Sequence, residues 1–274
     1  MPSGARAALK NFIARLPWGL RKLAAFVALH SPSGLLLSRP SFTGTYKSFT
    51  DAPPSRQTSA EYLVEEADLH LRAQKFDLVT GLPLLRNSHS LLPLMVAMLA
   101  PVKSVRVLDI GGAAGVDFAN VLSGTSSQTE IQYRVIDLPE VCALGRRRWE
   151  GDAQISFDDS MPSDGEEFDR IYSSWALQYF RDPLALLKKL AAYSAKAILL
   201  INIPFTAKTA FVRTQVNKGI PSWVLSLSDV QEVMHERGYA LAFHTAGDID
   251  HNVDNYQSEF RVSNGTNLLF LRRQ

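Results

Sequence analysis

The stretch Val105–Gly115 constrains the fold of this chain more than any other segment. Its first six residues form an apolar, β-branched run containing Asp109, and five small residues follow as a turn. A segment of helical character, Val116–Leu122, comes next. This order predicts a buried parallel strand, a tight turn and a helix N-terminus whose free N–H groups face a ligand. Small residues suit that turn because a Cβ would hold the backbone away from the ligand. The residues assigned to this ligand-binding turn are Asp109, Gly111, Gly112, Ala113 and Gly115.

The spacing of the glycines distinguishes between two kinds of cofactor turn. It does not follow the dinucleotide fingerprint G-x-G-x-x-G, because Ala113 and Ala114 occupy the middle of the turn. It resembles the Asp-x-Gly-x-Gly-x-Gly turn of S-adenosylmethionine-dependent methyltransferases, with Ala113 in place of the middle glycine. An ordinary strand–helix junction that binds no ligand is the alternative interpretation of this segment.

The composition is that of an ordinary globular protein. Of 274 residues, 46% are hydrophobic and 20% are charged, which suits one large α/β domain with an appendage or two small domains. The formal net charge of +2 gives no electrostatic reason to expect a nucleic-acid partner. Cys142 is the only cysteine, so a reducing, cytoplasmic compartment is expected. The sequence has no Cys-x-x-Cys or His-Glu-x-x-His motif, and no metal site is predicted.

The N-terminal segment has its own pattern. Apolar residues recur at helical spacing between Leu9 and Val27, with arginines and lysines between them. Such a basic amphipathic segment either packs on the protein itself or makes peripheral contact with the anionic inner face of a membrane. Pro17 and Gly19 interrupt a single helix. The absence of a clean cleavage site argues against a secretory signal.

From residue 105 onward, short apolar runs alternate with helical segments. Strands are expected over 105–110, 133–136, 154–157, 170–173, 197–201, 240–244 and 267–271. Helical segments separate the first six strands, which favours a parallel, doubly wound sheet. The connection 245–266 contains no clear helix, so the last strand should return antiparallel. The predicted fold is a Rossmann-like α/β sheet of seven mostly parallel strands with an antiparallel last strand, as in class I methyltransferases.

This pattern divides the chain in two. Residues 1–100 are expected to form a helical and loop-rich cap or lid, with helices over 60–73 and 90–99. Residues 101–274 are expected to form the cofactor-binding domain.

Ligands of such sheets bind at the carboxyl ends of the strands, so the residues there are candidates for the site. Asp137 and Leu138 follow the second strand, and a carboxylate suits the two ribose hydroxyls of a cofactor because both of its oxygens are acceptors. A helix N-cap is the alternative role for Asp137. Phe157 and Asp158 end the third strand, where they could contact an adenine ring and its amine. A simple solvated loop is the alternative there.

The fourth strand end is the richest in functional groups. Hydroxyls, an amide and an aromatic ring gather at Ser173, Ser174, Gln178 and Tyr179, where a reacting methyl group would lie. The alternative is a helix capped by one of the serines, with Tyr179 as a packing residue. The two interpretations are compatible, because a cap can also shape a pocket.

Several motifs spread over residues 42–225 point to one family. They are Phe42-x-Gly44-x-Tyr46-x-Ser48-Phe49-x-Asp51-Ala52, Leu108–Gly112, Ser173-Ser174-x-x-Leu177-Gln178-Tyr179, Pro204-Phe205, Thr214-Gln215-Val216 and Ile220–Trp223. Together they resemble the methyltransferases associated with bacterial surface-polysaccharide gene clusters. Two positions depart from that pattern, since Asn202 stands where a charged residue is expected and Ala113 interrupts the glycine series. The resemblance implies S-adenosylmethionine as cofactor and, as acceptor, a hydroxyl of a nucleotide sugar or surface glycan precursor.

Methyl transfer requires an aligned acceptor and, for a hydroxyl, somewhere for the proton to go. Candidates for positioning or proton transfer are Gln178, Tyr179 and Gln215. The histidines His89, His244 and His251 are further candidates for the same role, and Tyr46, His89 and His244 are candidates for the lid or the substrate pocket. We therefore predict an S-adenosylmethionine-dependent O-methyltransferase that acts on a small molecule. A non-catalytic binding or scaffold protein with the same fold, and an NAD(P)-dependent oxidoreductase, are the alternatives.

Overall fold

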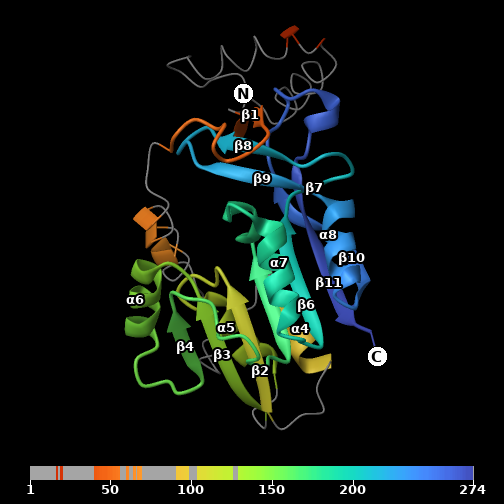
Figure 1. Cartoon of the computed structure of the whole chain (residues 1–274). Helices are drawn as coiled ribbons and strands as arrows, with labels where there is room; N and C mark the ends of the chain where they lie inside the picture. The colour runs from red at the N-terminus through yellow and green to blue at the C-terminus, as the bar shows by residue number, and fades with distance from the viewer. Residues whose placement is uncertain are drawn as a thin grey trace, which may run out of the picture.

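The computed structural model describes residues 17, 19–20, 40–55, 60–61, 64–65, 67–69, 91–98, 104–125 and 129–273. His89 and the predicted basic N-terminal segment, apart from residues 17 and 19–20, lie outside these residues. The described part contains a large sheet with helices on both faces and a smaller sheet at one end of it (Figure 1). No helix within the described part is both long and apolar enough to cross a lipid bilayer.

The large sheet has seven strands in the order β10-β11-β6-β5-β2-β3-β4. Their bounds are β2 Ser104–Ile110, β3 Glu130–Ile136, β4 Ile155–Asp158, β5 Arg170–Ser174, β6 Ala197–Ile203, β10 Tyr239–Asp250 and β11 Asn264–Arg272. β2 pairs in parallel with β3 and β5, whereas β11 is antiparallel to both of its neighbours. The structure therefore confirms the predicted fold class, including the reversed last strand.

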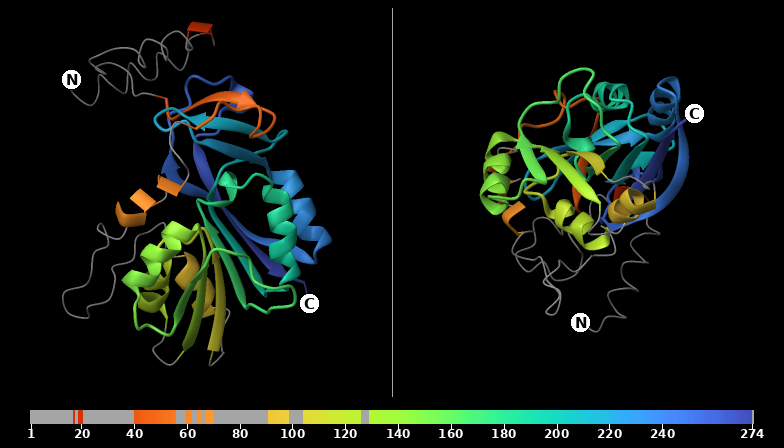
Figure 2. Two further views of the ribbon diagram at one scale, coloured as in Figure 1. Left: turned by 60° about the vertical axis from the view of Figure 1, so that its left-hand side comes forward. Right: turned by 90° about the horizontal axis from the view of Figure 1, so that it is seen from below.

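Side chains of the central strands alternate between the two faces of the large sheet, and each face has its own hydrophobic core. Val105 and Val107 face one side, where they pack with residues of α4 (Leu91–Met98), α5 (Val116–Gly124) and α6 (Pro139–Arg148). Leu108 and Ile110 face the other side, which α7 (Pro183–Ala192) and α8 (Leu227–Glu236) cover. Figure 2 shows the two helical layers from the end of the sheet. Because both faces are buried, the strands are nearly continuous apolar runs.

The smaller sheet was not predicted. Its order is β1-β8-β9-β7, with β1 Phe42–Tyr46, β7 Phe205–Thr206, β8 Phe211–Gln215 and β9 Pro221–Ser226. β1 comes from the N-terminal region and pairs antiparallel with β8, which is inserted between β6 and α8. In Figure 1 this sheet lies across the end of the large sheet at which its parallel strands finish. It therefore covers the end at which ligands bind in folds of this kind.

The remaining boundaries follow the sequence pattern closely. The segment 60–73 is helical wherever it is described, and the helix expected over 90–99 is α4. The connection after β10 contains only a short 3-10 turn, η3 (Ser258–Phe260). The main difference is the length of β10, which continues past His244 to Asp250 and carries the chain up to the small sheet.

The contact between α6 and β4 yields a test of the core. A Cβ added to Gly145 would collide with the ring of Phe157, so the helix approaches the strand only because residue 145 is glycine. Alanine would favour the helix by ~1 kcal/mol, but overpacking costs ~1–3 kcal/mol. We expect Gly145→Ala to lower the free energy of unfolding, measured by urea denaturation. Adding Phe157→Leu to Gly145→Ala should recover part of the loss, as a double-mutant cycle would record. Increased stability in Gly145→Ala alone would contradict this account.

Candidate active site

The turn after β2 is held by left-handed backbone conformations. Gly111, Ala113 and Gly115 have φ angles of 71°, 51° and 80°. The backbone N–H of Gly111 donates to the carbonyl of Ile136 at 2.8 Å, which ties the turn to the end of β3. Gly115 occupies the N-cap position of α5. The turn is therefore fixed between the ends of two neighbouring strands and the start of a helix.

Contacts within the protein explain the glycines of this turn. An added Cβ would strike the side chain of Ala176 from Gly111, and the carboxyl group of Asp109 from Gly112. From Gly115 it would come within 2.7 Å of the Trp149 indole nitrogen. Close approach of a ligand is one reason for small residues at these positions. The structure adds a separate requirement, because the turn packs directly on the protein.

Asp137 links the end of β3 to the turn. Its Oδ2 atom accepts a hydrogen bond from the backbone N–H of Ala113 at 2.9 Å, and its Oδ1 atom accepts one from Leu138 at 2.8 Å. Burial raises the pKa of this carboxyl group, and the two backbone donors oppose that change. Each oxygen keeps a further lone pair, so the group can still accept from a ribose diol. The alternative role as N-cap of α6 is wrong, because Leu138 occupies that position.

Acidic side chains lie close to the turn. Asp109 is fully buried, and its Oδ2 atom accepts a hydrogen bond from the Tyr133 hydroxyl at 2.7 Å. Its Oδ1 atom has no hydrogen-bond partner in the described part of the chain. Burial, with the nearby charges of Asp117 and Asp137, raises the pKa of Asp109 well above its usual range. Such a site fits a ligand with cationic groups, such as the sulfonium and ammonium groups of S-adenosylmethionine, because a nearby cation stabilises the carboxylates.

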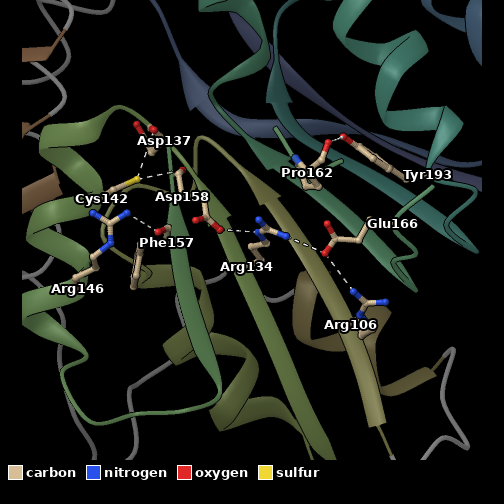
Figure 3. A network of polar contacts seen from close by, with 10 residues as sticks. All are labelled: Arg106, Arg134, Asp137, Cys142, Arg146, Phe157, Asp158, Pro162, Glu166 and Tyr193. Atoms are coloured by element: carbon tan, nitrogen blue, oxygen red, sulfur yellow. Dashed lines mark hydrogen bonds and ion pairs between the residues drawn. The ribbon is translucent and has the colours of Figure 1, made fainter. Parts of the chain in front are cut away.

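The two residues predicted near an adenine ring have partners within the protein. The ring of Phe157 is buried between the turn and α6, in contact range of Gly115 and Gly145. Asp158 forms an ion pair with Arg134 at 2.6 Å, and Arg134 also pairs with Glu166 at 2.8 Å (Figure 3). Adenine contacts of Phe157 and Asp158 therefore stay a prediction. Their structural roles are packing and an ion pair.

The serines at the end of β5 also have structural roles. The Ser173 hydroxyl is buried and donates to the carbonyl of Ile110 at 3.0 Å, which joins β5 to β2 just before the turn. Ser174 is half-buried. Neither serine caps the next element, because the 3-10 turn over Leu177–Tyr179 (η2) begins after Ala176 and has no side-chain cap. The capping alternative is wrong, and cofactor contacts by these serines stay a prediction.

Two of the predicted catalytic residues, Gln178 and Tyr179, line a narrow crevice, and the third, Gln215, is hydrogen-bonded to Tyr179. Tyr179 accepts a hydrogen bond from Gln215 Nε2 at 2.9 Å, and Gln178 Nε2 donates to the Trp175 carbonyl at 3.0 Å. The crevice is lined by Phe42, Trp175, Gln178, Tyr179, Asn202, Pro204, Arg213, Ser222, His251 and Gly265. It adjoins the cofactor turn, because Ala176, which follows Trp175, packs on Gly111. Strands of both sheets therefore contribute to it.

His251 is the histidine that faces this crevice. Its ring lies 4.9 Å from that of Phe42 and 5.3 Å from that of Trp175, centroid to centroid. Its Nε2 atom is buried without a hydrogen-bond partner in the described part of the chain. Burial and the positive charge of Arg213 lower the pKa of His251 to about 4. The imidazole is therefore neutral at physiological pH and able to accept a proton.

Other predicted lid and substrate residues lie outside the crevice. His244 is exposed on the edge strand β10, opposite Leu268. The Tyr46 ring on β1 folds back against Gly44, whose carbonyl accepts a hydrogen bond from the Tyr256 hydroxyl at 2.9 Å. Tyr46 is thus part of the small sheet that covers the crevice, and its role as a lid residue stays a prediction.

Sequence reasoning missed two residues of the crevice. Arg213 is only 2% exposed, and on β8 it lies between the apolar Phe211–Val212 and the polar Thr214–Gln215. Asn202 departs from the family pattern, which by itself indicates no role in the site. It has a φ of 55°, and its backbone N–H donates to Asn267 Oδ1 at 2.9 Å. The position of Arg213 directly before the Thr214-Gln215-Val216 motif was the available signal for this residue.

The reversed seventh strand, the glycine turn after β2 and the acid at the end of β3 define a Rossmann-like class I methyltransferase. The profile of the methyltransferase-domain family matches residues 61–247, and the chain belongs to that family. S-adenosylmethionine is its cofactor, and binding of that cofactor at the turn and at Asp137 stays a prediction. A comparison with curated proteins returned no match.

Solved structures show the same fold at low sequence identity. A chain from the complex of the Haloferax volcanii Trm112 methyltransferase activator with a methyltransferase shares 16% identity and a TM-score of 0.53, over 80% of this chain and 99% of that one. The Burkholderia thailandensis 1,6-didemethyltoxoflavin-N1-methyltransferase shares 13% and 0.50, over 82% and 93%. The [4+2]-cyclase SpnF shares 14% and 0.50, over 81% and 97%. These similarities concern the fold alone.

Removal of the Asp137 carboxylate should weaken cofactor binding. Hydrogen bonds to a charged group contribute ~1.5–3 kcal/mol, so Asp137→Ala should raise the Kd for S-adenosylhomocysteine about 10–100-fold by isothermal titration. Asp159→Ala, which removes an exposed acid two positions beyond Phe157, is the matched control and should bind like the wild type. Equal affinity in Asp137→Ala would rule out this role.

Cofactor binding should also release protons. The raised pKa of Asp109 means that the free protein retains a proton on this group to a higher pH than usual. A cationic ligand favours the carboxylate, so binding should release up to about one proton, and the Kd should fall as pH rises through the raised pKa. Titration of S-adenosylmethionine in buffers of different ionisation enthalpy measures this release. Asp109→Asn should abolish it, and a buffer-independent enthalpy for the wild type would refute it.

Proposed function

We propose that this protein transfers the methyl group of S-adenosylmethionine to a hydroxyl of a small molecule in the cytoplasm. The acceptor would be a nucleotide sugar or a surface glycan precursor. The observation that supports this most directly is the crevice beside the cofactor turn, in which a neutral histidine presents an unpartnered nitrogen. The resemblance to surface-polysaccharide methyltransferases supports the acceptor class.

The residues of the crevice suit the needs of an oxygen acceptor. The cofactor, when bound, supplies a methyl group that is already electrophilic. His251 can take the hydroxyl proton on Nε2 as the acceptor oxygen forms its new bond, while Gln178 and the Tyr179–Gln215 pair orient the acceptor. Tyr179 is suited to donating a hydrogen bond rather than to acting as a base, because burial raises its pKa to about 12. The cover of the small sheet, with Tyr46 on β1, excludes water.

The alternative functions make different demands on this site. A nicotinamide-dependent oxidoreductase would need the dinucleotide glycine spacing, which Ala113 and Ala114 do not supply. A non-catalytic scaffold would bind S-adenosylmethionine without turnover. Because SpnF carries its cyclase activity on a related fold, only measured turnover distinguishes an enzyme from a binding protein.

The test is the formation of S-adenosylhomocysteine with a panel of nucleotide sugars, followed by mass spectrometry of the products. We expect a mass gain of one methyl group on an acceptor hydroxyl. Cofactor binding with no turnover on any small hydroxyl compound would favour the scaffold function, and failure to bind the cofactor would reject the methyltransferase proposal itself.

Loss of the proposed base should affect turnover and leave cofactor binding intact. General-base catalysis contributes ~10²–10⁴-fold, so His251→Gln should lower kcat by about two orders of magnitude at pH 7. The wild-type kcat/KM should be flat around neutrality and fall only near the pKa of His251, about 4, because the imidazole is protonated below it. His235→Gln, which changes an exposed histidine on α8, is the control. An unchanged kcat in His251→Gln would remove this assignment.

A further inference from the structure

One buried cation of the crevice remains without a counter-charge. The Arg213 guanidinium lies on β8, lines the crevice and is almost wholly buried. Its Nη1 atom donates to the Val262 carbonyl at 2.7 Å, and its Cζ atom lies 3.7 Å from the centre of the Phe42 ring. No carboxylate in the described part of the chain pairs with it. This differs from Arg134, which contacts two acids.

The contacts of Arg213 do not fully compensate for the burial of its charge. A buried charge is costly unless it is paired and hydrogen-bonded, and here one carbonyl and one aromatic face supply only part of that compensation. The Nε atom is buried with no hydrogen-bond partner in the described residues. Burial lowers the pKa of Arg213 to about 10, so the group remains a cation at neutral pH. The crevice therefore carries a positive charge and an unused N–H donor.

The residues around Arg213 indicate which kind of ligand would pair with its guanidinium group. The other polar residues that line the crevice are Gln178, Tyr179, Asn202, Ser222 and His251. All are uncharged at neutral pH, so the site has a net charge of one sign. A guanidinium whose Nε has no hydrogen-bond partner among the described residues matches an oxyanion such as a phosphate or a carboxylate.

We infer that Arg213 is the binding group for an oxyanion, a phosphate or a carboxylate, carried by the acceptor substrate. This inference rests on the proposed function, since it specifies the acceptor of the same crevice. It requires the acceptor to place its anionic group on β8 while its hydroxyl lies beside His251. Neutral sugars without such a group are then poor acceptors, and the small sheet acts as the specificity element of the enzyme.

Anion binding at Arg213 should change His251 as well. The charged groups that act on His251 are Arg213 from β8 and Asp250, its neighbour at the end of β10, while Phe42 and Trp175 contact its ring. An anion on Arg213 neutralises the charge that disfavours the imidazolium. The histidine then becomes a stronger base only when a suitable acceptor is bound.

The first experiment measures anion binding with simple probes. Thermal unfolding of the wild type, Arg213→Met and Arg213→Lys is followed in chloride-free buffer with inorganic phosphate and, separately, acetate. We expect phosphate, acetate or both to raise the wild-type Tm, Arg213→Met to lose this rise, and Arg213→Lys to retain less than half of it. The two probes distinguish a phosphate site from a carboxylate site.

A control addresses anions bound elsewhere. A second hollow, lined by Asp164, Gly165, Lys188, Lys189, Ala192, Tyr193 and Arg237, carries exposed cations at the other end of the protein. Lys189→Met should leave the anion effect unchanged. If Lys189→Met abolishes the effect and Arg213→Met retains it, the inference is wrong.

The second experiment needs no substitution at Arg213 and decides the matter if Arg213→Met does not fold. The pKa of His251 is measured in the wild type by NMR, with its resonance assigned from His251→Gln, in the absence and presence of the anion. A rise of roughly one pH unit supports the inference, since nearby charges shift a pKa by this amount. An unchanged value at anion concentrations that raise the Tm overturns it.

Cofactor titration separates this inference from the proposed function. Arg213→Met should bind S-adenosylhomocysteine within about twofold of the wild type, because Arg213 lies outside the cofactor turn. A wild type that binds S-adenosylhomocysteine but neither anion refutes the inference and leaves the methyltransferase function standing. A wild type that binds an anion at Arg213 but no S-adenosylhomocysteine refutes the proposed function and keeps the anion site.

Discussion

The close approach of the Gly111–Gly115 turn to its own protein is the constraint on which the rest of the structure depends. The turn packs on Ala176 after β5, on Asp109 of β2 and on Trp149 beyond α6, and these contacts leave no room for a Cβ on any of its three glycines. The Ser173–Ile110 hydrogen bond joins the same two strands just below it. Cofactor turn and crevice are thus parts of one rigid junction at the point where the strand order reverses. Positioning for methyl transfer needs such rigidity.

The central fold could be predicted because its signal is local. Each strand of the large sheet is a short apolar run between turn residues, and the reversed last strand follows from a connection without a helix. The small sheet gave no comparable signal. Its strands are short, and β1 pairs with β8 across most of the chain, a pairing that no local pattern encodes. The pattern of apolar residues alone therefore predicts only helices and loops for the N-terminal region.

The site was predictable to a similar degree. Gln178, Tyr179 and Gln215 meet in the structure because a motif on η2 and a motif on β8 lie on facing elements. No sequence pattern ranks His251 above His244, since the burial that lowers the pKa of His251 arises only in the folded chain. Arg213 was overlooked because the sequence pattern predicts no strand over Phe211–Gln215, and therefore no burial of this side chain. Only the three-dimensional arrangement shows that its charge lacks a carboxylate among the described residues.

The pairing of β1 with β8 also has a consequence for folding order. The residues of the cofactor turn and of the first five strands of the large sheet are nearly contiguous in the chain, so their contacts close short loops. The crevice instead depends on contacts such as that between the Asn255 side chain and the Phe42 carbonyl, 213 residues apart. Closing so long a loop carries the larger entropic cost and slows folding. During synthesis, β1 leaves the ribosome before β8 and must wait for it, so the half that contains the glycine turn can form before the half that encloses the crevice.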